Sequence, residues 1–227
     1  MIMTGRRSEG QQRQWETTYV QKDFFGSKPS ELAESVLPLM LQEKVRDVVE
    51  LGCGQGRDTW YFARNGLFVT AMDYSEAGIC QLRDRANDMN LGNIKGQVHD
   101  VRDGLPFQDN SIDAIYSHML MCMELSDEEL QSIMDECFRV LRPGGLKIFS
   151  VRNDHDPHYG KFDAAGKDMW RNPMGFVVHF FTKEQIESLA KGWEIVHIKE
   201  FEDRSPPFTK KLYEVVLRKP KRTVEAF

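Results

Sequence analysis

A short glycine-rich segment is the first candidate for chemistry in this sequence. It reads Glu50-Leu51-Gly52-Cys53-Gly54-Gln55-Gly56 and follows two apolar residues, Val48 and Val49, that are typical of a buried strand. Glycines allow a backbone to approach a ligand that a Cβ atom would hold away. The spacing is G-x-G-x-G, not the G-x-G-x-x-G of a pyrophosphate loop, and the carboxylate of Glu50 would repel phosphates. The segment therefore favours a cationic ligand without phosphate groups.

Two acidic residues follow the next two predicted strands. Asp73 comes after residues 67–72, and Asp100 comes after the strand expected at residues 94–99. A carboxylate at the first position can accept hydrogen bonds from two ribose hydroxyls. A carboxylate at the second can accept one from an adenine amino group, with the Val101 amide facing a ring nitrogen. S-adenosylmethionine (SAM) has both of these groups, a sulfonium, an ammonium and no phosphate, so the pattern indicates SAM rather than a dinucleotide.

The elements that carry these residues alternate between short strands and helices. Capping patterns mark two helix starts, with Ser126 followed by Glu129 and Thr182 followed by Gln185. The hydrophobic pattern predicts five strands, at residues 48–51, 67–72, 94–99, 112–117 and 146–151.

The chain after residue 152 follows a different pattern. Residues 153–180 are rich in Gly, Pro, His and aromatic residues and predict an irregular segment. Residues 193–201 and 211–219 predict two more strands, joined into a terminal hairpin by a turn at Pro206-Pro207. We therefore expect an α/β fold with a Rossmann-like, doubly wound sheet of seven strands. The sheet should be mostly parallel with an antiparallel C-terminal hairpin, and helices should cover both faces.

We expect a single domain over residues 1–227. The helix that begins near Ser30 should bend or end at Pro38, because proline removes a helical hydrogen bond. In chain order the parts are a flexible leader, an N-terminal lid and helix, a cofactor-binding core, a substrate-side insertion, and a last helix with the hairpin. Their ranges are 1–14, 15–44, 45–152, 153–180 and 181–219.

The composition argues against several classes of protein. The 227 residues include 30 Lys+Arg and 35 Asp+Glu, and the net charge of −5 does not favour binding to nucleic acid. No apolar run is long enough to span a membrane, and the first 14 residues lack an apolar signal segment. The four cysteines form no C-x-x-C pair, so we expect reduced thiols in a cytoplasmic protein. We expect no metal site, because His155, His158 and His179 lack the H-x-x-x-H spacing of a helical site.

The glycine segment, the two acidic residues and the turn Arg142-Pro143-Gly144-Gly145-Leu146 together resemble the class I SAM-dependent methyltransferases. The resemblance covers roughly residues 45–152, about half of the chain. It implies that residues 52–56 cradle the amino acid part of SAM and that residues 117–119 line the floor beneath the methyl group. It implies that the cofactor is held by Trp15, Glu50, Gly52, Cys53, Gly54, Gly56, Asp73, Tyr74, Asp100, Val101 and Ser117.

Scattered positions also resemble one subgroup, the tellurite-resistance and thiopurine-type small-molecule methyltransferases. In such enzymes an N-terminal aromatic residue closes over SAM, which implies a lid role for Trp15 or Tyr19. The matching positions are Trp15 and residues 26–30, 56–58, 181–184 and 192–195.

The expected function is methyl transfer from SAM to a small molecule, with release of S-adenosylhomocysteine, by a monomer or homodimer. The sulfonium is already an activated leaving group, so the main tasks are alignment and exclusion of water. A soft nucleophile needs no strong base. An acceptor that must lose a proton would use His118 first, and His155 or His179 second. The residues expected to face the substrate are Tyr19, Met119, Arg152 and Tyr159.

Other interpretations stay open at this point. The acceptor could be protein or RNA, the chain could bind SAM without catalysis, and each candidate histidine could simply be packed. The segment Ser205-Pro206-Pro207-Phe208 has the letters of an amino-methyltransferase signature, which must follow the fourth strand. There the chain has Ser117-His118-Met119-Leu120 instead. We interpret the Pro-Pro as a turn, which argues against N-methylation of adenine or glutamine.

Overall fold

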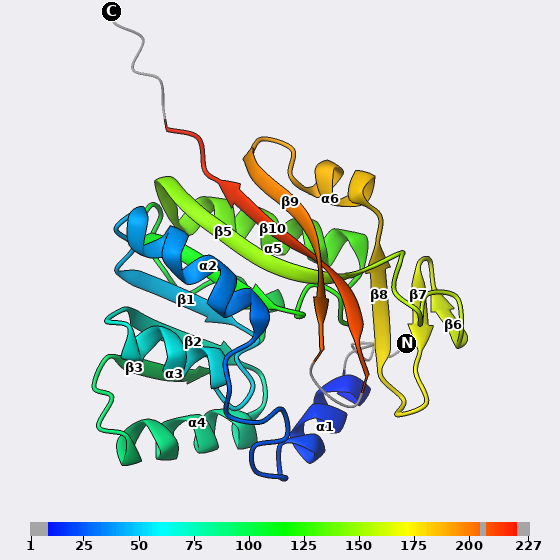
Figure 1. The fold of residues 1–227 in the computed structure, drawn as a ribbon, viewed down its shortest axis with the longest axis horizontal. Coiled ribbons are helices and arrows are strands. Elements are labelled where there is room, and N and C mark those ends of the chain that lie inside the picture. Colours follow the sequence, from blue (N-terminus) through cyan, green and yellow to red (C-terminus); the bar gives the residue numbers. More distant parts are fainter. Residues whose placement is uncertain (1–8, 205–207, 222–227) are drawn as a thin grey trace, which may run out of the picture.

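The computed structural model describes residues 9–204 and 208–221. Its centre is a sheet whose first five strands are parallel, in the order β3-β2-β1-β4-β5 (Figure 1). The strand order reverses between β1 and β4, and open α/β sheets bind ligands beyond the carboxyl ends of strands at such a point. The strands are β1 (Asp47–Leu51), β2 (Phe68–Asp73), β3 (Ile94–Val98), β4 (Ile112–His118) and β5 (Leu141–Asn153).

A terminal hairpin completes the expected sheet. β10 (Lys210–Arg218) lies antiparallel to β5, and β9 (Glu194–Asp203) lies antiparallel to β10. These seven strands confirm the predicted fold class, a mostly parallel sheet with an antiparallel C-terminal hairpin. The turn expected at Pro206-Pro207 lies outside the described residues.

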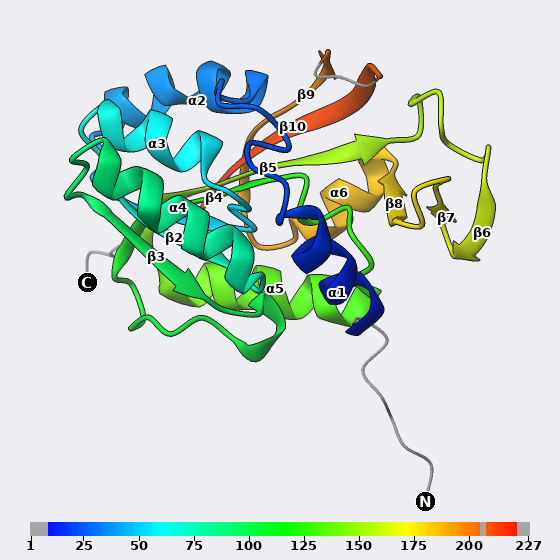
Figure 2. The same cartoon turned by 90° about the horizontal axis from the view of Figure 1, so that it is seen from below.

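Helices cover both faces of the sheet, as expected (Figure 2). Val48 packs with the α2, α3 and α4 side of the sheet, whereas its neighbour Val49 packs with the α5 and α6 side. Side chains alternate along a strand, so a fully buried parallel strand is apolar at successive positions. The helices are α2 (Glu31–Gln42), α3 (Arg57–Arg64), α4 (Glu76–Asp88), α5 (Asp127–Val140) and α6 (Lys183–Leu189).

Both predicted capping boxes are confirmed. The Ser126 hydroxyl accepts a hydrogen bond from the Glu129 amide at 3.2 Å, and the Glu129 carboxylate accepts one from the Ser126 amide at 2.8 Å. The same reciprocal pair links Thr182 and Gln185 at the start of α6. These local patterns are readable in the sequence because both partners lie within one helical turn.

Pro38 does not end α2, which runs on to Gln42. Of the two outcomes expected at Pro38, a bend or an end of the helix, the end was wrong. Val36, Leu37 and Met40 are buried on either side of the proline. Packing of this apolar face offsets the hydrogen bond that the proline removes.

The segment expected to be irregular contains three short strands. These are β6 (Asp163–Gly166), β7 (Met169–Arg171) and β8 (Val177–Phe181). β6, β7 and β8 pair antiparallel in turn, and β8 pairs with the far end of β5 through Arg152 and Asn153. The expectation was therefore wrong for these stretches. Strands of three to five residues are too short to show a hydrophobic period.

The described chain begins with a helix, α1 (Glu9–Thr18). Residues 9–14 are therefore helical and not part of a flexible leader, whereas the rest of the expected leader lies outside the described residues. Gln11 and Gln14 donate side-chain hydrogen bonds to the carbonyls of Val177 and Met174, which hold α1 against the insertion. In the described part of the chain, no helix is long and apolar enough to cross a membrane.

Candidate cofactor and acceptor site

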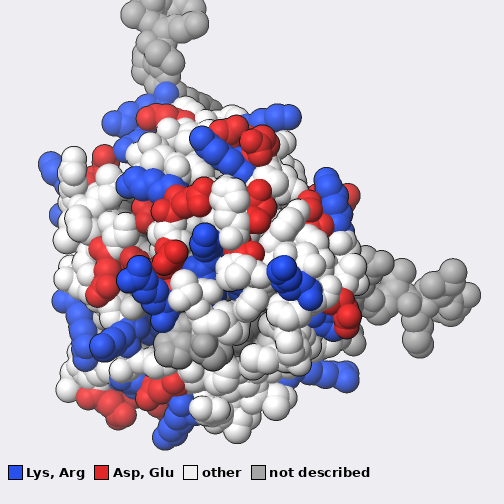
Figure 3. All heavy atoms as spheres, turned by 45° about the vertical axis from the view of Figure 1, so that its right-hand side comes forward, with Lys and Arg blue, Asp and Glu red and all other residues white. Residues whose placement is uncertain are grey.

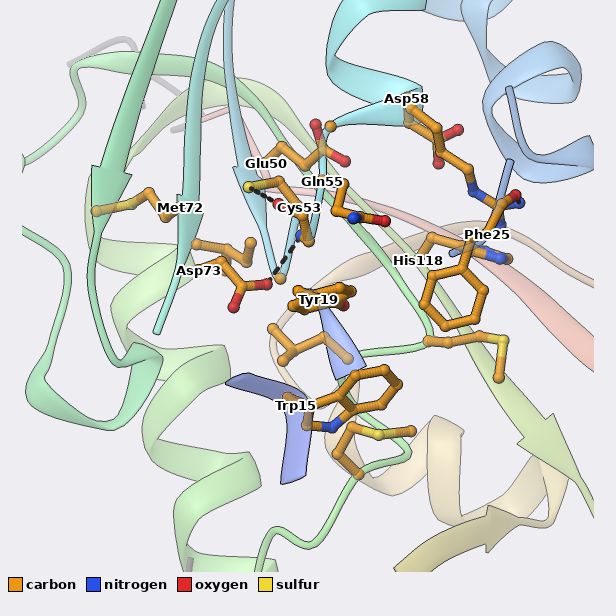
Figure 4. Close-up of a pocket in the computed structure, with 18 of the residues that line it drawn as sticks. Trp15, Tyr19, Phe25, Glu50, Cys53, Gln55, Asp58, Met72, Asp73 and His118 are labelled. Atoms are coloured by element: carbon orange, nitrogen blue, oxygen red, sulfur yellow. Dashed lines mark hydrogen bonds between the residues drawn. The ribbon is translucent and has the colours of Figure 1, made fainter. Parts of the chain in front are cut away.

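A pocket lies at the carboxyl ends of β1, β2 and β4, next to α1 (Figure 4). This is the position that the strand order of the sheet predicts for a ligand. The structure brings most of the expected site residues together here. The predicted residues that line the pocket are Trp15, Tyr19, Glu50, Gly52, Cys53, Gly54, Gly56, Asp73, Tyr74, Val101, His118 and Met119.

The glycine loop follows a path that side chains would block. Gly52, Gly54 and Gly56 all have positive φ angles, of 71°, 53° and 91°. A Cβ atom on Gly54 would lie 2.7 Å from the hydroxyl oxygen of Tyr19, and one on Gly56 would lie 2.8 Å from the Leu82 side chain. The loop therefore needs glycine both for its backbone conformation and for the close approach of its neighbours.

Asp73 ends β2 and lies under the glycine loop. Its Oδ2 accepts a hydrogen bond from the Gly54 amide and its Oδ1 accepts one from the Ser75 amide, each at 2.8 Å. The side chain reaches the pocket although the residue is only 8% exposed. Burial raises the pKa of Asp73 to about 6, while the two amides oppose that shift. Each oxygen keeps a second lone pair for a ligand hydroxyl.

Glu50 is the last residue but one of β1 and is almost completely buried, at 3% exposure. It accepts a hydrogen bond from the Thr59 hydroxyl at 2.5 Å. Burial, and next the nearby charge of Asp58, raise the pKa of Glu50 well above its ordinary value. Asp58 lines the same pocket and accepts hydrogen bonds from the Ser30 amide and hydroxyl and from the Tyr116 hydroxyl. Two buried acids side by side would be stabilised by a cation in the pocket.

Aromatic side chains of Trp15 in α1 and of Tyr19, the residue after α1, lie over the glycine loop (Figure 4). Trp15 stacks on Tyr19 with ring centroids 5.4 Å apart, and it contacts Phe176 of the insertion at 4.4 Å. The Glu16 carboxylate accepts hydrogen bonds from the Ser75 hydroxyl and the Ala77 amide, at 2.6 and 2.9 Å. These contacts attach α1 to the N-terminus of α4 and hold the two aromatic rings over the loop.

Two of the expected cofactor residues do not line the pocket. Asp100 caps the N-terminus of the short helix η1 (Val101–Asp103), where its carboxylate accepts hydrogen bonds from the amide and guanidinium of Arg102. Ser117 is fully buried and accepts a hydrogen bond from the buried Lys147 ammonium at 3.1 Å. The pocket is lined at this end by His99, Val101 and Tyr74.

His118 ends β4 and contributes to the pocket wall. Its Nδ1 lies 2.8 Å from the Ser150 hydroxyl, and its Nε2 lies 3.7 Å from Asp203 Oδ2. The Lys210 ammonium lies 3.6 Å from the same Asp203 oxygen. Asp203 and Lys210 both line the pocket, and our sequence analysis missed them. They reach it only because β9 and β10 pair with β5, a contact that no local sequence pattern encodes.

Two of the expected substrate residues lie away from this pocket. Arg152 is buried in a bidentate ion pair with Asp156 and lies over the Phe180 ring, 5.1 Å from its centroid. The Tyr159 hydroxyl donates to Asp168 at 3.4 Å. Both residues serve contacts within the insertion and its junction with β5.

The two secondary histidine candidates also lie elsewhere. His155 is exposed and its Nδ1 lies 3.2 Å from the Glu200 carboxylate. His179 is buried and its ring stacks on Phe181, with centroids 4.2 Å apart. Within residues 9–204 and 208–221, no group of three or more His, Cys, Asp or Glu side chains is arranged to hold a metal ion.

Comparison with known proteins agrees with this geometry. Residues 48–145 match the family described as a methyltransferase domain. Phosphoethanolamine N-methyltransferase 1 of Caenorhabditis elegans is 38% identical over 101 residues, which are 44% of this chain and 20% of the relative. The tRNA N(3)-methylcytidine methyltransferase Mettl2 of Drosophila melanogaster is 30% identical over 164 residues, which are 63% of this chain and 47% of the relative. The chain thus spans less than half the length of these two relatives.

The fold agrees with solved methyltransferase structures as well. TehB from Haemophilus influenzae superposes with a TM-score of 0.63 at 22% identity, over 82% of this chain and 62% of TehB. A likeness at this identity shows a shared fold. The family match includes the glycine loop, Asp73 and the strands that carry them. Residues 48–145 therefore form a methyltransferase domain, and the chain has the fold of SAM-dependent methyltransferases.

Proposed function

We propose that the protein transfers a methyl group from SAM to a small-molecule acceptor and releases S-adenosylhomocysteine. The observation that carries this proposal is the pair of buried carboxylates, Glu50 and Asp73, on either side of a loop that only glycine fits. This set of groups suits a ligand with a cationic end and a ribose, and it does not suit phosphates.

The residues of the pocket divide into three groups by what they would hold. Asp73 has free lone pairs for ribose hydroxyls. Glu50 and the loop of residues 52–56 offer a negative potential and backbone groups for the amino acid end. Tyr74 and Val101 flank the space for the adenine ring. When bound, SAM supplies a methyl group on a sulfonium, which leaves without help from an acid.

The chain's own contribution is therefore orientation and exclusion of water. Trp15 and Tyr19 cover the glycine loop, and Tyr19 is only 7% exposed. Met119 and Met123 line the pocket beyond β4 and form an apolar wall on the side of His118. A dry, shaped pocket that aligns two reactants can supply most of the acceleration that such a transfer needs.

Two features favour a small acceptor. The pocket lies next to α1, whose contacts on α4 and on the insertion leave it partly enclosed. The face in Figure 3 carries interspersed acidic and basic side chains rather than a continuous basic surface, and the chain has a net charge of −5. Tight binding of tRNA needs many phosphate contacts from Lys and Arg. The similarity to a phosphoethanolamine methyltransferase agrees with a small acceptor.

An RNA acceptor is the second candidate function, because one relative is a tRNA methyltransferase. Transfer of a labelled methyl group distinguishes the two. We expect label in the small-molecule fraction of a cell extract. Label in RNA would favour the second candidate instead.

The first test of the proposal is calorimetric titration with SAM and S-adenosylhomocysteine, with NADH as the negative control. We expect micromolar binding of both sulfur compounds and none of NADH. Gly54→Ala should weaken binding at least about tenfold, because its Cβ would displace the Tyr19 hydroxyl from its 2.7 Å position.

A matched control separates this contact from general backbone strain. Gly66 also has a positive φ, of 87°, but a Cβ there would meet nothing within 4 Å. Gly66→Ala should therefore bind both compounds like the natural protein. Absence of binding by the natural protein would refute the proposed function.

A further inference from the structure

His118 has an unused ring nitrogen that faces an acid. The side chain is 10% exposed, and its Nε2 has no hydrogen-bond partner among residues 9–204 and 208–221. A buried ring nitrogen in this state costs free energy unless a ligand or a reaction uses it. The Oδ2 atom of Asp203 lies 3.7 Å from it, which is too long for a direct hydrogen bond.

The orientation of the ring is fixed from the other side. Ser150 on β5 lies 2.8 Å from Nδ1, and its hydroxyl also accepts a hydrogen bond from the Met119 amide at 3.1 Å. Met119 has a positive φ of 59°, so the chain turns sharply just after His118. When Nδ1–H donates to the Ser150 hydroxyl, Nε2 presents its lone pair toward the pocket wall.

Asp203 and Lys210 lie at the ends of β9 and β10 and approach His118 from the hairpin. Asp203 is 2% exposed, and the Lys210 ammonium lies 3.6 Å from its Oδ2. Asp203 is therefore shared between an imidazole and an ammonium. Other charged groups that line the same pocket are Arg57 and Asp58 at the start of α3, Glu50 of β1 and Asp73 of β2.

We propose that His118 takes the proton of the methyl acceptor at Nε2 and that Asp203 is the positioning residue that stabilises the resulting imidazolium. The inference rests on the proposed function. It assigns the acceptor to compounds whose nucleophile carries a proton, that is, a hydroxyl or an N–H group, rather than to a thiolate or another soft anion.

The proton and electron count balances without a further reactant. The acceptor X–H gives its proton to His118 Nε2, and its electron pair forms the new bond from X to the methyl carbon. The bond from that carbon to the SAM sulfur breaks, and its electron pair stays on S-adenosylhomocysteine. Asp203 carries one negative charge within 4 Å of the imidazolium so formed.

The first experiment measures the ratio of imidazolium to imidazole in His118 at pH 6.5, from ring carbon shifts in the protein bound to S-adenosylhomocysteine. His118→Asn assigns the signal. Asp203→Asn should lower the ratio, because it removes a negative charge that lies 3.7 Å from Nε2. Lys210→Met should raise the ratio, because it removes the cation that competes for Asp203.

Opposite changes of the His118 ratio in Asp203→Asn and Lys210→Met would identify an electrostatic interaction between His118 and Asp203. A purely structural defect would not shift the ratio in opposite directions in the two variants. Glu200→Gln is the matched control. Glu200 lies on β9, as Asp203 does, but its carboxylate lies beside the exposed His155. Its replacement should therefore move the His155 signal and leave the His118 signal unchanged. Equal ratios for His118 in the natural protein and in Asp203→Asn would overturn the proposal.

The second experiment tests the acceptor class with matched hydroxyl and thiol compounds of the same carbon skeleton and labelled SAM. For the hydroxyl compounds, Asp203→Asn should lower kcat about a hundredfold with little change in KM, and Asp203→Glu should restore part of the loss. For the thiols the change should stay within about threefold, because a thiol is already partly ionised near neutral pH. Turnover confined to thiols would overturn the assignment.

The failure of this inference can be separated from the failure of the proposed function. Calorimetry with S-adenosylhomocysteine tests the function first. If that compound binds and His118 does not respond to Asp203, the inference alone fails. If the compound does not bind, the proposed function fails. The ratio of imidazolium to imidazole in His118 of the ligand-free protein then still tests whether Asp203 acts on His118.

Discussion

Asp73 shows how burial adjusts a single group for ligand binding. Its carboxylate is fixed by two backbone amides and its pKa is raised to about 6 by burial. The ionised form is the one that accepts two ribose hydrogen bonds. Because the raised pKa disfavours that form in the free protein, protonation competes with the ligand in a pH range where an exposed aspartate would stay ionised.

The affinity for S-adenosylhomocysteine should therefore depend on Asp73 protonation. We expect it to be nearly constant from pH 8 to pH 7 and to fall as the pH decreases through 6. Calorimetry between pH 5 and pH 8 measures this. Asp73→Asn should bind more weakly at pH 8 and should lose the dependence on pH around 6.

Asp100→Asn is the control for this prediction, because the carboxylate of Asp100 is held by Arg102 outside the pocket. It should keep the pH dependence of the natural protein. Equal affinity of the natural protein at pH 5 and pH 8 would show that the Asp73 carboxylate does not contact the ligand.

At the scale of elements, helix α1 connects parts of the chain that are distant in sequence. Glu16 accepts two hydrogen bonds at the N-terminus of α4, and Gln11 donates to the carbonyl of Val177 in β8. The helix is mostly polar and only ten residues long, so these tertiary contacts fix its position more than its own propensity does.

Glu16→Ala should loosen α1 and weaken binding of S-adenosylhomocysteine about tenfold. It removes two hydrogen bonds to a charged acceptor, and each such bond contributes on the order of 1.5–3 kcal/mol before the chain relaxes. Calorimetry gives the affinity, and proteolysis within α1 reports the loosening. Thr17→Ala is the control, because the Thr17 hydroxyl bonds only to the Arg13 carbonyl of its own helix turn in the described structure. Equal binding by both variants would contradict the lid role of α1.

The elements also show what the sequence could predict and what it could not. The loop at residues 50–56, Asp73 and both capping boxes were found because each depends on residues close together in the chain. β6 and β7 were missed because they are four and three residues long. Asp203 and Lys210 were missed because they reach the pocket only through the pairing of β9 and β10 with β5.

At the scale of the whole molecule, the pocket joins segments from the N-terminus, the parallel core and the terminal hairpin. Its lining includes Trp15, Asp73 and Lys210, which come from these three parts of the chain. Because these parts meet only in the folded chain, a ligand that needs all of them binds the folded state and not the unfolded state. Its binding free energy therefore adds to the free energy of unfolding of the entire domain.

Saturating S-adenosylhomocysteine should therefore raise the melting temperature. At one hundred times its dissociation constant the ligand adds about 2.7 kcal/mol, which for a domain of this size corresponds to about 5–10 °C. A calorimetric or fluorescence melting curve measures the shift, and NADH at the same concentration should give none. An unchanged melting temperature at saturation would contradict binding in the shared pocket.

The contact between Tyr19 and the glycine loop has a consequence for the timing of the reaction. The Tyr19 hydroxyl lies so close to Gly54 that it would touch a Cβ there, and the residue is almost completely buried. This contact closes one wall of the pocket, so a product bound there departs only after Tyr19 has moved away from the glycine loop. For acceptors whose methylation is fast, the slowest step of each cycle is then the lifting of α1, and turnover with those acceptors should fall as solvent viscosity rises.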